Sequence, residues 1–292
     1  MAGITIFGIT GRMGQTLLRA LREGDAVYTD AVYTDAVYTA GAAAPGGCAA
    51  PLRLIGAVAG PHSSRLGKDA ATEGAATGVM VGADARLGLV GAAVAVDFSL
   101  PQCVAGVARA CMEARIPLLV GTTGFDPAAR AALEAAAAVI PVLIAPNTSV
   151  GVNVVARLVK LATLALGAGY DVEISEAHHR MKRDAPSGTA LGLGEVVARA
   201  RGREFKEVAV FERHGNSAPR NAGDIGFTAL RAGDIVGEHT VTFAAAGERV
   251  EITHRATDRI TFARGALRAA NWLSRRPPGL YTMDDVLGSE QA

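Results

Sequence analysis

The residues best suited to chemistry lie together in one run, Glu176 to Ala190, which reads EAHHRMKRDAPSGTA. It holds two adjacent histidines, His178 and His179, and a nearby lysine, Lys182. An imidazole is the natural proton donor near neutral pH, and like charge around a lysine lowers its pKa toward useful values. The run therefore predicts proton transfer in a cationic pocket.

The same run predicts the start of a helix. Ser187 is a good N-cap residue, and the amides of Gly188 and Thr189 follow it at the positive end of the helix dipole, where a carboxylate or phosphate binds well. A lone histidine is more often an ordinary surface or core residue, and an N-cap usually only caps. Because these features converge in one short segment, we favour an anion site. The histidines have no acidic or cysteine partner at ligand spacing, so we expect no metal.

A second candidate site is a glycine turn near the N-terminus. Gly8, Gly11 and Gly14 follow a β-prone run at 4–7 and precede a helical stretch. This spacing suits a strand that turns sharply into a helix whose N–H groups face a pyrophosphate, and Arg12 adds a cation. Glycines at this spacing also occur by chance and then only permit a turn. Their position after the first strand favours a dinucleotide site.

The residue that reads the ribose of such a cofactor is usually acidic and should close the second strand near Ala59. The segment from Ala59 to Arg65 reads AGPHSSR and offers hydroxyls and cations instead. A 2′-phosphate would be tolerated there and held by Arg65 or Lys68, unless these are solvated loop charges. We therefore expect NADPH or NADH to serve, with some preference for NADPH.

Short apolar runs alternate with alanine-rich helical stretches in the first half of the chain. Strands are predicted at 4–7, 54–59, 94–98, 117–120 and 142–145, and helices at 104–114 and 128–138. Such alternation indicates an α/β fold with a parallel sheet. The segment 25–50 breaks the rhythm, because AVYTD repeats there with a period of neither helix nor strand. We interpret it as an inserted surface loop, with a contact arm as the alternative.

After residue 149 the pattern becomes richer in strands. A helix at 152–166, a strand at 171–175 and a helix at 187–200 precede strands at 225–231, 239–245 and 249–254, with a last helix at 263–273. The short glycine-containing links between the later strands predict antiparallel pairs. A second, smaller α+β domain with a mixed sheet is expected.

Composition narrows the function classes. The chain has 29 Lys+Arg and 28 Asp+Glu, so it offers no broad basic field for nucleic acid. It has three cysteines without a CxxC pair, no secretory signal at its start and no uninterrupted apolar stretch of membrane-spanning length. We expect a cytoplasmic protein that binds neither nucleic acid nor membrane.

Several motifs together resemble the 4-hydroxy-tetrahydrodipicolinate reductase family, also called dihydrodipicolinate reductase. These are the GxxGRMG turn, VGTTGF at 120–125, Asn147 followed by SVGVN at 149–153, the run at 176–190, and RAGDIVGEH at 231–239. The run at 176–190 is highly specific. The resemblance implies a Rossmann-type cofactor domain of residues 1–149 and 258–292 and a substrate-binding and tetramerisation domain of residues 150–257.

The resemblance also implies an activity and its residues. The reaction would reduce a cyclic hydroxylated dicarboxylate to tetrahydrodipicolinate in the diaminopimelate route to lysine. His178 would donate the proton, Lys182 would be a second proton-handling or charge-stabilising group, and the substrate carboxylates would be bound by His179, Ser187, Gly188 and Thr189. The cofactor would contact Gly8, Ile9, Thr10, Gly11, Arg12, Met13, Gly121, Thr122, Thr123, Ala145, Pro146, Asn147 and Thr148.

Two positions depart from the family pattern: Ala59 stands where an acidic residue is usual, and Thr148 where an aromatic residue is common. The resemblance further implies a homotetramer formed through the strands at 225–254. Two alternatives stay open from the residues alone. One is another two-domain dehydrogenase acting on an amino-acid semialdehyde, and the other is a non-catalytic protein that senses nicotinamide nucleotides.

Overall fold

The computed structural model describes residues 1–24, 51–215 and 218–288. The predicted insertion at 25–50 lies outside these residues. The described chain forms two compact units, one made of the segments up to Val150 and from Ile260 onward, the other of Gly151–Arg259. The boundaries predicted from the sequence fall one and two residues from these points.

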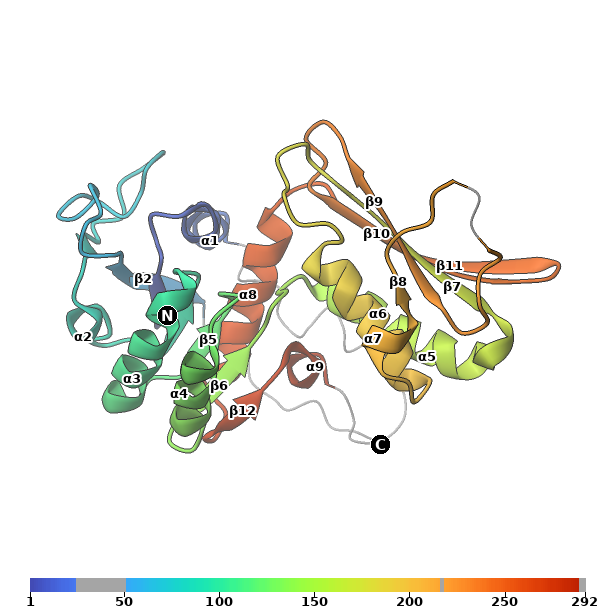
Figure 1. Ribbon diagram of the computed structural model, residues 1–292. Coiled ribbons are helices and arrows are strands. Elements are labelled where there is room, and N and C mark those ends of the chain that lie inside the picture. The colour runs from blue at the N-terminus through green and yellow to red at the C-terminus, as the bar shows by residue number, and fades with distance from the viewer. Residues whose placement is uncertain (25–50, 216–217, 289–292) are drawn as a thin grey trace. The chain divides into compact units, whose positions relative to one another are not determined.

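The first unit is built on a seven-stranded sheet in which every pair is parallel, with the order β12-β6-β5-β4-β1-β2-β3 (Figure 1). Its strands are β1 (Ala2–Phe7), β2 (Leu52–Val58), β3 (Val81–Gly82), β4 (Val94–Asp97), β5 (Leu118–Val120), β6 (Pro141–Ile144) and β12 (Gly279–Tyr281). Its helices are α1 (Arg12–Arg22), α2 (Ala85–Gly88), α3 (Val104–Ala114), α4 (Pro127–Ala137), α8 (Ile260–Leu273) and α9 (Met283–Val286). The predicted parallel α/β sheet is confirmed.

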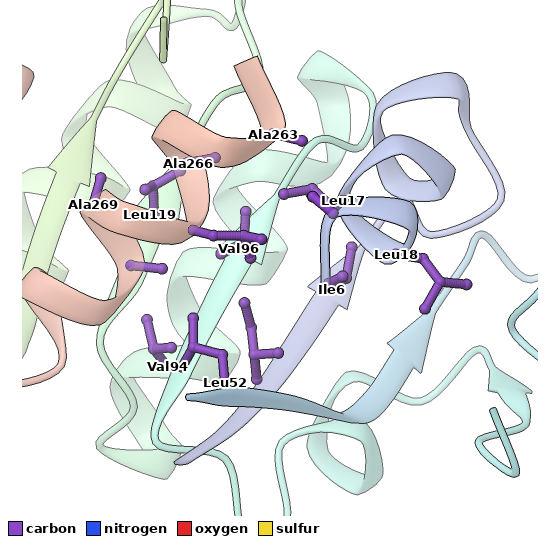
Figure 2. Close-up of a cluster of buried hydrophobic side chains, with 14 of the residues drawn as sticks. Ile6, Leu17, Leu18, Leu52, Val94, Val96, Leu119, Ala263, Ala266 and Ala269 are labelled. Atoms are coloured by element: carbon purple, nitrogen blue, oxygen red, sulfur yellow. The ribbon is translucent and has the colours of Figure 1, made fainter. Parts of the chain in front are cut away.

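Alternate strand residues supply two cores, one on each face of this sheet. On one face Ile6, Val96 and Leu119 pack against α1 and α8, and Figure 2 shows Ala263, Ala266 and Ala269 of α8 beside them. On the other face lie the next residues along the strands, such as Ala95, which pack against α3 and α4. Sheets covered on both faces are the rule for parallel strands, which explains why these strands are mostly apolar.

The second unit has a five-stranded sheet with the order β11-β10-β7-β9-β8. The prediction of a mixed sheet is confirmed. Its strands are β7 (Asp171–His178), β8 (Ala209–Val210), β9 (Ile225–Arg231), β10 (Gly237–Ala245) and β11 (Glu248–Ala256), and its helices are α5 (Val150–Leu166), α6 (Gly188–Ala200) and α7 (Phe205–Val208). The pairs β7–β9 and β8–β9 are parallel, and β10 pairs antiparallel with β7 and β11.

One face of the mixed sheet carries a core against α5 and α6. Ile174, Val241 and Phe227 lie in it together with Val159 of α5. The predicted strand at 171–175 was too short, because β7 continues to His178. Since strand residues alternate between faces, the polar residues at the end of β7 share the face that carries the core.

Helix α5 and the turn after it, Val150–Gly169, form one helical stretch long and apolar enough to cross a membrane by length and composition alone. Arg157 and Lys160 interrupt its apolar residues, and Val155 and Val159 are buried in the core of the unit. A core helix passes the same test, although only 22% of the apolar window is buried inside the structure.

Candidate active site

A buried carboxylate, that of Glu176 on β7, lies at the centre of a polar cluster in the second unit. Its Oε2 lies 2.6 Å from Nδ1 of His178, and its Oε1 accepts a hydrogen bond of 3.0 Å from the amide of Ser187. Arg231 on β9 donates to both oxygens, at 2.8 and 2.7 Å. Because no part of the Glu176 side chain is exposed, these bonds replace water around a charged group.

Strand pairing explains why these residues meet. Glu176 and His178 are two residues apart on β7 and therefore point to the same face of the sheet. The register pairs His178 with Arg231 and Glu176 with His239, which in turn pairs with His254. The cluster thus continues the apolar core at one end of the same face.

The cluster shifts the pKa values of both central groups. Burial alone would raise the pKa of Glu176, but the hydrogen bonds from Arg231 and His178 outweigh it and hold that pKa below its ordinary value. Burial lowers the pKa of His178, and the charges of Lys182 and Arg231 add to this, while the bond and charge of Glu176 oppose it. The net result is a His178 that gives up a proton more readily than a free imidazole.

His239 on β10 joins this cluster to the start of α6. Its Nε2 lies 3.0 Å from Oγ of Ser187, and the same Oγ accepts a bond of 3.2 Å from the amide of Ala190. Ser187 is therefore the N-cap that the sequence predicted. The ring of His239 meets that of His178 edge to face at 5.1 Å, and burial, followed by the charge of His178, lowers the pKa of His239 to about 4.

The other residues predicted from the run at 176–190 have different surroundings. Gly188 is exposed, with no atom within 4 Å of where a Cβ would stand. Nε2 of His179 lies 3.2 Å from Nη2 of Arg259. Lys182 was predicted to stand among like charges, but its Nζ lies 2.9 Å from a carboxylate oxygen of Asp184.

In the part of the chain that the structure describes, no group of three His, Cys, Asp or Glu side chains has a metal-binding arrangement.

In the first unit, the glycine turn joins β1 to α1 as predicted. Gly8 has φ +77°, and a Cβ there would overlap the carbonyl of Phe98. A Cβ on Gly14 would stand 2.5 Å from the carbonyl oxygen of Gly8, so the turn has room for glycine alone at both positions. The amides of Gly8 and Ile9 donate to the carbonyl of Val58, at 2.9 and 3.3 Å, so they are used within the fold.

The predicted turn after β5 lies beside the end of β4. The ring of Phe98 occupies the space that a side chain on Gly121 would need. The hydroxyl of Thr122 donates to Oδ2 of the buried Asp97 at 3.1 Å, and Asp97 also accepts from the amide of Ser99 at 2.9 Å. Burial raises the pKa of Asp97. This carboxyl therefore ties together two turns at the carboxyl ends of neighbouring parallel strands, where ligands of such sheets bind.

The turn after β6 reaches the same edge, because the amide of Ala145 donates to the carbonyl of Val120 at 2.9 Å. Oδ1 of Asn147 accepts a hydrogen bond of 2.9 Å from the amide of Ser149, so this side chain caps its own loop. The hydroxyl of Thr148 donates to the carbonyl of Phe262 at 2.7 Å, and this residue is 2% exposed. Its hydroxyl is therefore bonded to α8 within the fold.

In the loop after β2, Arg65 makes hydrogen bonds within that loop. Its Nη2 donates to the carbonyls of Asp69 and Ala71, at 2.7 and 2.8 Å. Lys68 is exposed. Of the two cations predicted for a 2′-phosphate, Arg65 therefore has a structural role, and Lys68 is placed at the surface.

Comparisons with known proteins show the family of the chain. Residues 151–287 match the family described as dihydrodipicolinate reductase, C-terminus, and residues 47–148 match its N-terminus. The 4-hydroxy-tetrahydrodipicolinate reductase of Thiobacillus denitrificans is 50% identical over 98% of both chains, and that of Alkalilimnicola ehrlichii is 47% identical over the same shares. The chain belongs to the dihydrodipicolinate reductase family.

A solved dihydrodipicolinate reductase has the same fold. The dipicolinate-bound enzyme from Paenisporosarcina sp. TG-14 is 20% identical and superposes with a TM-score of 0.69 over 97% of both chains.

Sequence reasoning missed several functional candidates in this member of the dihydrodipicolinate reductase family. They are Glu176, Arg231, His239 and Asp97. For Glu176 a signal existed, because its spacing from His178 places both on one strand face. Arg231 and His239 are the first and last residues of the RAGDIVGEH motif. This motif supported the family resemblance, but no role was predicted for either residue.

Proposed function

We propose that this protein is a 4-hydroxy-tetrahydrodipicolinate reductase. It would convert (2S,4S)-4-hydroxy-2,3,4,5-tetrahydrodipicolinate, NAD(P)H and a proton into tetrahydrodipicolinate, NAD(P)⁺ and water, in the diaminopimelate route to lysine. One observation carries the proposal. The run at 176–190 folds so that an imidazole tied to a buried carboxylate stands beside a helix N-terminus, in a chain that matches reductases of this name along almost its whole length.

The residues of the second unit suit the two tasks of this reaction. The amides at the start of α6 offer the positive end of a helix dipole to a carboxylate, and we assign His179 and Lys182, which precede α6 in the same run, to the same dicarboxylate. His178 has its Nδ1 bound to Glu176, so its Nε2 is the atom that would hold and release the proton. We therefore assign to this unit the task of orienting the dicarboxylate substrate against the proton donor, His178.

The first unit fits a dinucleotide. Glycines without room for a Cβ shape the first turn, and Arg12 is exposed at the start of α1. A bound reduced nicotinamide supplies the hydride. Ala59 at the end of β2 places no carboxylate against a 2′-phosphate, so we propose that both NADPH and NADH serve, with NADPH preferred.

A spectrophotometric assay tests the function directly. Purified protein mixed with freshly generated hydroxytetrahydrodipicolinate should oxidise NADPH and NADH, and His178→Gln should lower kcat by roughly 100-fold. The exposed His214 provides a matched control, because it has no assigned role and His214→Gln should leave kcat unchanged. Binding of nicotinamide nucleotide without substrate-dependent oxidation would instead indicate a sensor, and turnover of an amino-acid semialdehyde alone would indicate another dehydrogenase.

We further propose that the protein is a cytoplasmic homotetramer. Cys103 and Cys111 are both free thiols, which suits a reducing compartment. The face of β10 and β11 opposite the core carries partly or fully exposed residues such as Thr240 and Thr253, whose hydroxyls lie 3.0 Å apart. Such a sheet surface would provide the contact between subunits, and light scattering after size-exclusion chromatography would give the mass.

A further inference from the structure

One buried carboxylate connects the proton donor to the helix start. Oε2 of Glu176 meets Nδ1 of His178 at 2.6 Å, while Oε1 accepts the amide of Ser187, the N-cap of α6, at 3.0 Å. A shift of this carboxylate would therefore move the imidazole and the anion-binding end of α6 together.

The contact determines which nitrogen of His178 carries a hydrogen. An ionised carboxylate only accepts hydrogen bonds, so the hydrogen of neutral His178 must lie on Nδ1, and any added proton goes to Nε2. That side of the ring faces Gly237, where a Cβ would stand 3.1 Å from Nε2. Glycine at this position leaves the Nε2 edge less crowded than any other residue would.

The titratable and charged groups near His178 come from several elements. Lys182 and Asp184 lie in the loop after β7, Arg231 on β9, and His239 and His254 on β10 and β11. Burial, Lys182 and Arg231 all disfavour the imidazolium, and Glu176 opposes them. A proton donor needs that imidazolium, so the carboxylate contributes charge as well as orientation.

Arg231 favours the ionised form of the Glu176 carboxylate. Its two bonds to Glu176 stabilise the ionised form and hold the pKa of Glu176 below its ordinary value despite complete burial of the side chain. Its Nη2 also donates to the carbonyl of Asp184 at 2.5 Å, which fixes the loop that carries Lys182.

We propose that Glu176 is a positioning residue shared by the proton donor and the carboxylate-binding helix start, and that Arg231 keeps it ionised. The catalytic part of this inference rests on the proposed function, whereas the tautomer and charge state of His178 do not require turnover.

The test uses unliganded protein labelled with ¹⁵N in its histidine rings, with the His178 signals assigned by their loss in His178→Gln. We expect neutral His178 to be the Nδ1–H tautomer. In Glu176→Gln its pKa should fall by about one unit or more, because a full charge is removed from a bond inside the protein. Glu173→Gln is the matched control. Glu173 lies on the same strand but pairs with Arg213 on the opposite face, so the pKa of His178 should not move.

Kinetics then separate positioning from mere folding. In Glu176→Gln the basic limb of the kcat profile should shift to lower pH by the change seen in the titration, so that kcat at pH 8 falls roughly tenfold per unit. In Glu176→Ala, which removes both oxygens, KM for the dicarboxylate should also rise. Thermal unfolding of each variant identifies any that fail to fold.

The outcomes are distinguishable. An Nε2–H tautomer in the wild type, or an unchanged His178 pKa in folded Glu176→Gln, overturns the positioning role whatever the activity. The expected titration in a protein that never turns over the dicarboxylate supports the positioning role and sinks the proposed function instead.

Discussion

Nε2 of His239 and Oγ of Ser187 lie 3.0 Å apart, although 52 residues separate them in the chain. Ser187 caps α6, so a histidine on β10 supports the start of the helix that we assign to the substrate carboxylates. The histidine is 4% exposed, and its Nδ1 has no partner within the described part of the chain. Protonation of His239 is therefore unfavourable, because it would bury a charge beside His178. This links the protonation of His239 to the stability of the fold.

His239 should make the protein less stable in acid. Its pKa is about 4 in the folded chain, against about 6.5 in the unfolded chain. Between these values the unfolded chain binds the proton and the native state does not, so the free energy of unfolding falls as pH falls through this window. From pH 7.5 to 5 the loss should be about 2 kcal/mol, and His239→Gln should remove it.

Urea unfolding at both pH values measures this difference. The exposed His62 supplies the control, because His62→Gln should keep the wild-type loss. An equal loss in wild type and His239→Gln would show that other groups, such as the buried Glu176, carry the acid sensitivity.

Gly237 should be needed for activity more than for folding. A Cβ there would stand 3.1 Å from Nε2 of His178, which is tight enough to displace the ring edge that we assign to proton release. Gly237→Ala should lower kcat by roughly tenfold or more, a cost of about 1.4 kcal/mol in the barrier. Steady-state kinetics and thermal unfolding measure the two effects separately.

The control for this change is Gly192 within α6, where nothing lies within 4 Å of a Cβ. Gly192→Ala should raise the free energy of unfolding by about 0.5–1 kcal/mol, as alanine does inside a helix, with kcat unchanged. If both alanine variants retained wild-type kcat, the Nε2 edge of His178 would not be the site of proton release.

Pattern in the sequence predicts local structure well and long-range pairing poorly. The helix at 104–114 and the strand at 225–231 were predicted with the bounds that the structure has, because their apolar periodicity and flanking residues are strong. Strands β3 and β12 contain only two and three residues, too few to show a period, and were missed. The register that brings Arg231 and His239 to Glu176 depends on which strands pair, and no local pattern encodes that choice.

The same limit applies to Thr148. Family resemblance placed it at the nicotinamide end, where an aromatic residue is common. Its hydroxyl instead meets a carbonyl 114 residues further along the chain. Lys182 was expected among cations for a similar reason, since the run of basic residues around it concealed the pairing with Asp184.

The two cations after β2 should separate stability from cofactor choice. Arg65 holds two loop carbonyls, so Arg65→Ala should lower the free energy of unfolding by about 1–2 kcal/mol. Lys68 is exposed, so Lys68→Ala should leave stability unchanged and raise KM for NADPH severalfold while KM for NADH stays constant. Loss of NADPH use in Arg65→Ala without loss of stability would reverse these assignments.

Thr148 and Thr123 form a matched pair that tests the cofactor edge of the first unit. Thr148 is buried and its hydroxyl donates to the carbonyl of Phe262, so Thr148→Val loses this hydrogen bond and should cost about 1 kcal/mol of unfolding free energy, with KM for NADPH and NADH nearly unchanged. Thr123 is exposed in the turn after β5, so Thr123→Val should leave stability within about 0.5 kcal/mol and raise KM for both cofactors. The same chemical change is made in each variant, so only the surroundings can separate their effects. Were Thr148→Val to weaken cofactor binding while keeping full stability, the hydroxyl would face the nicotinamide after all.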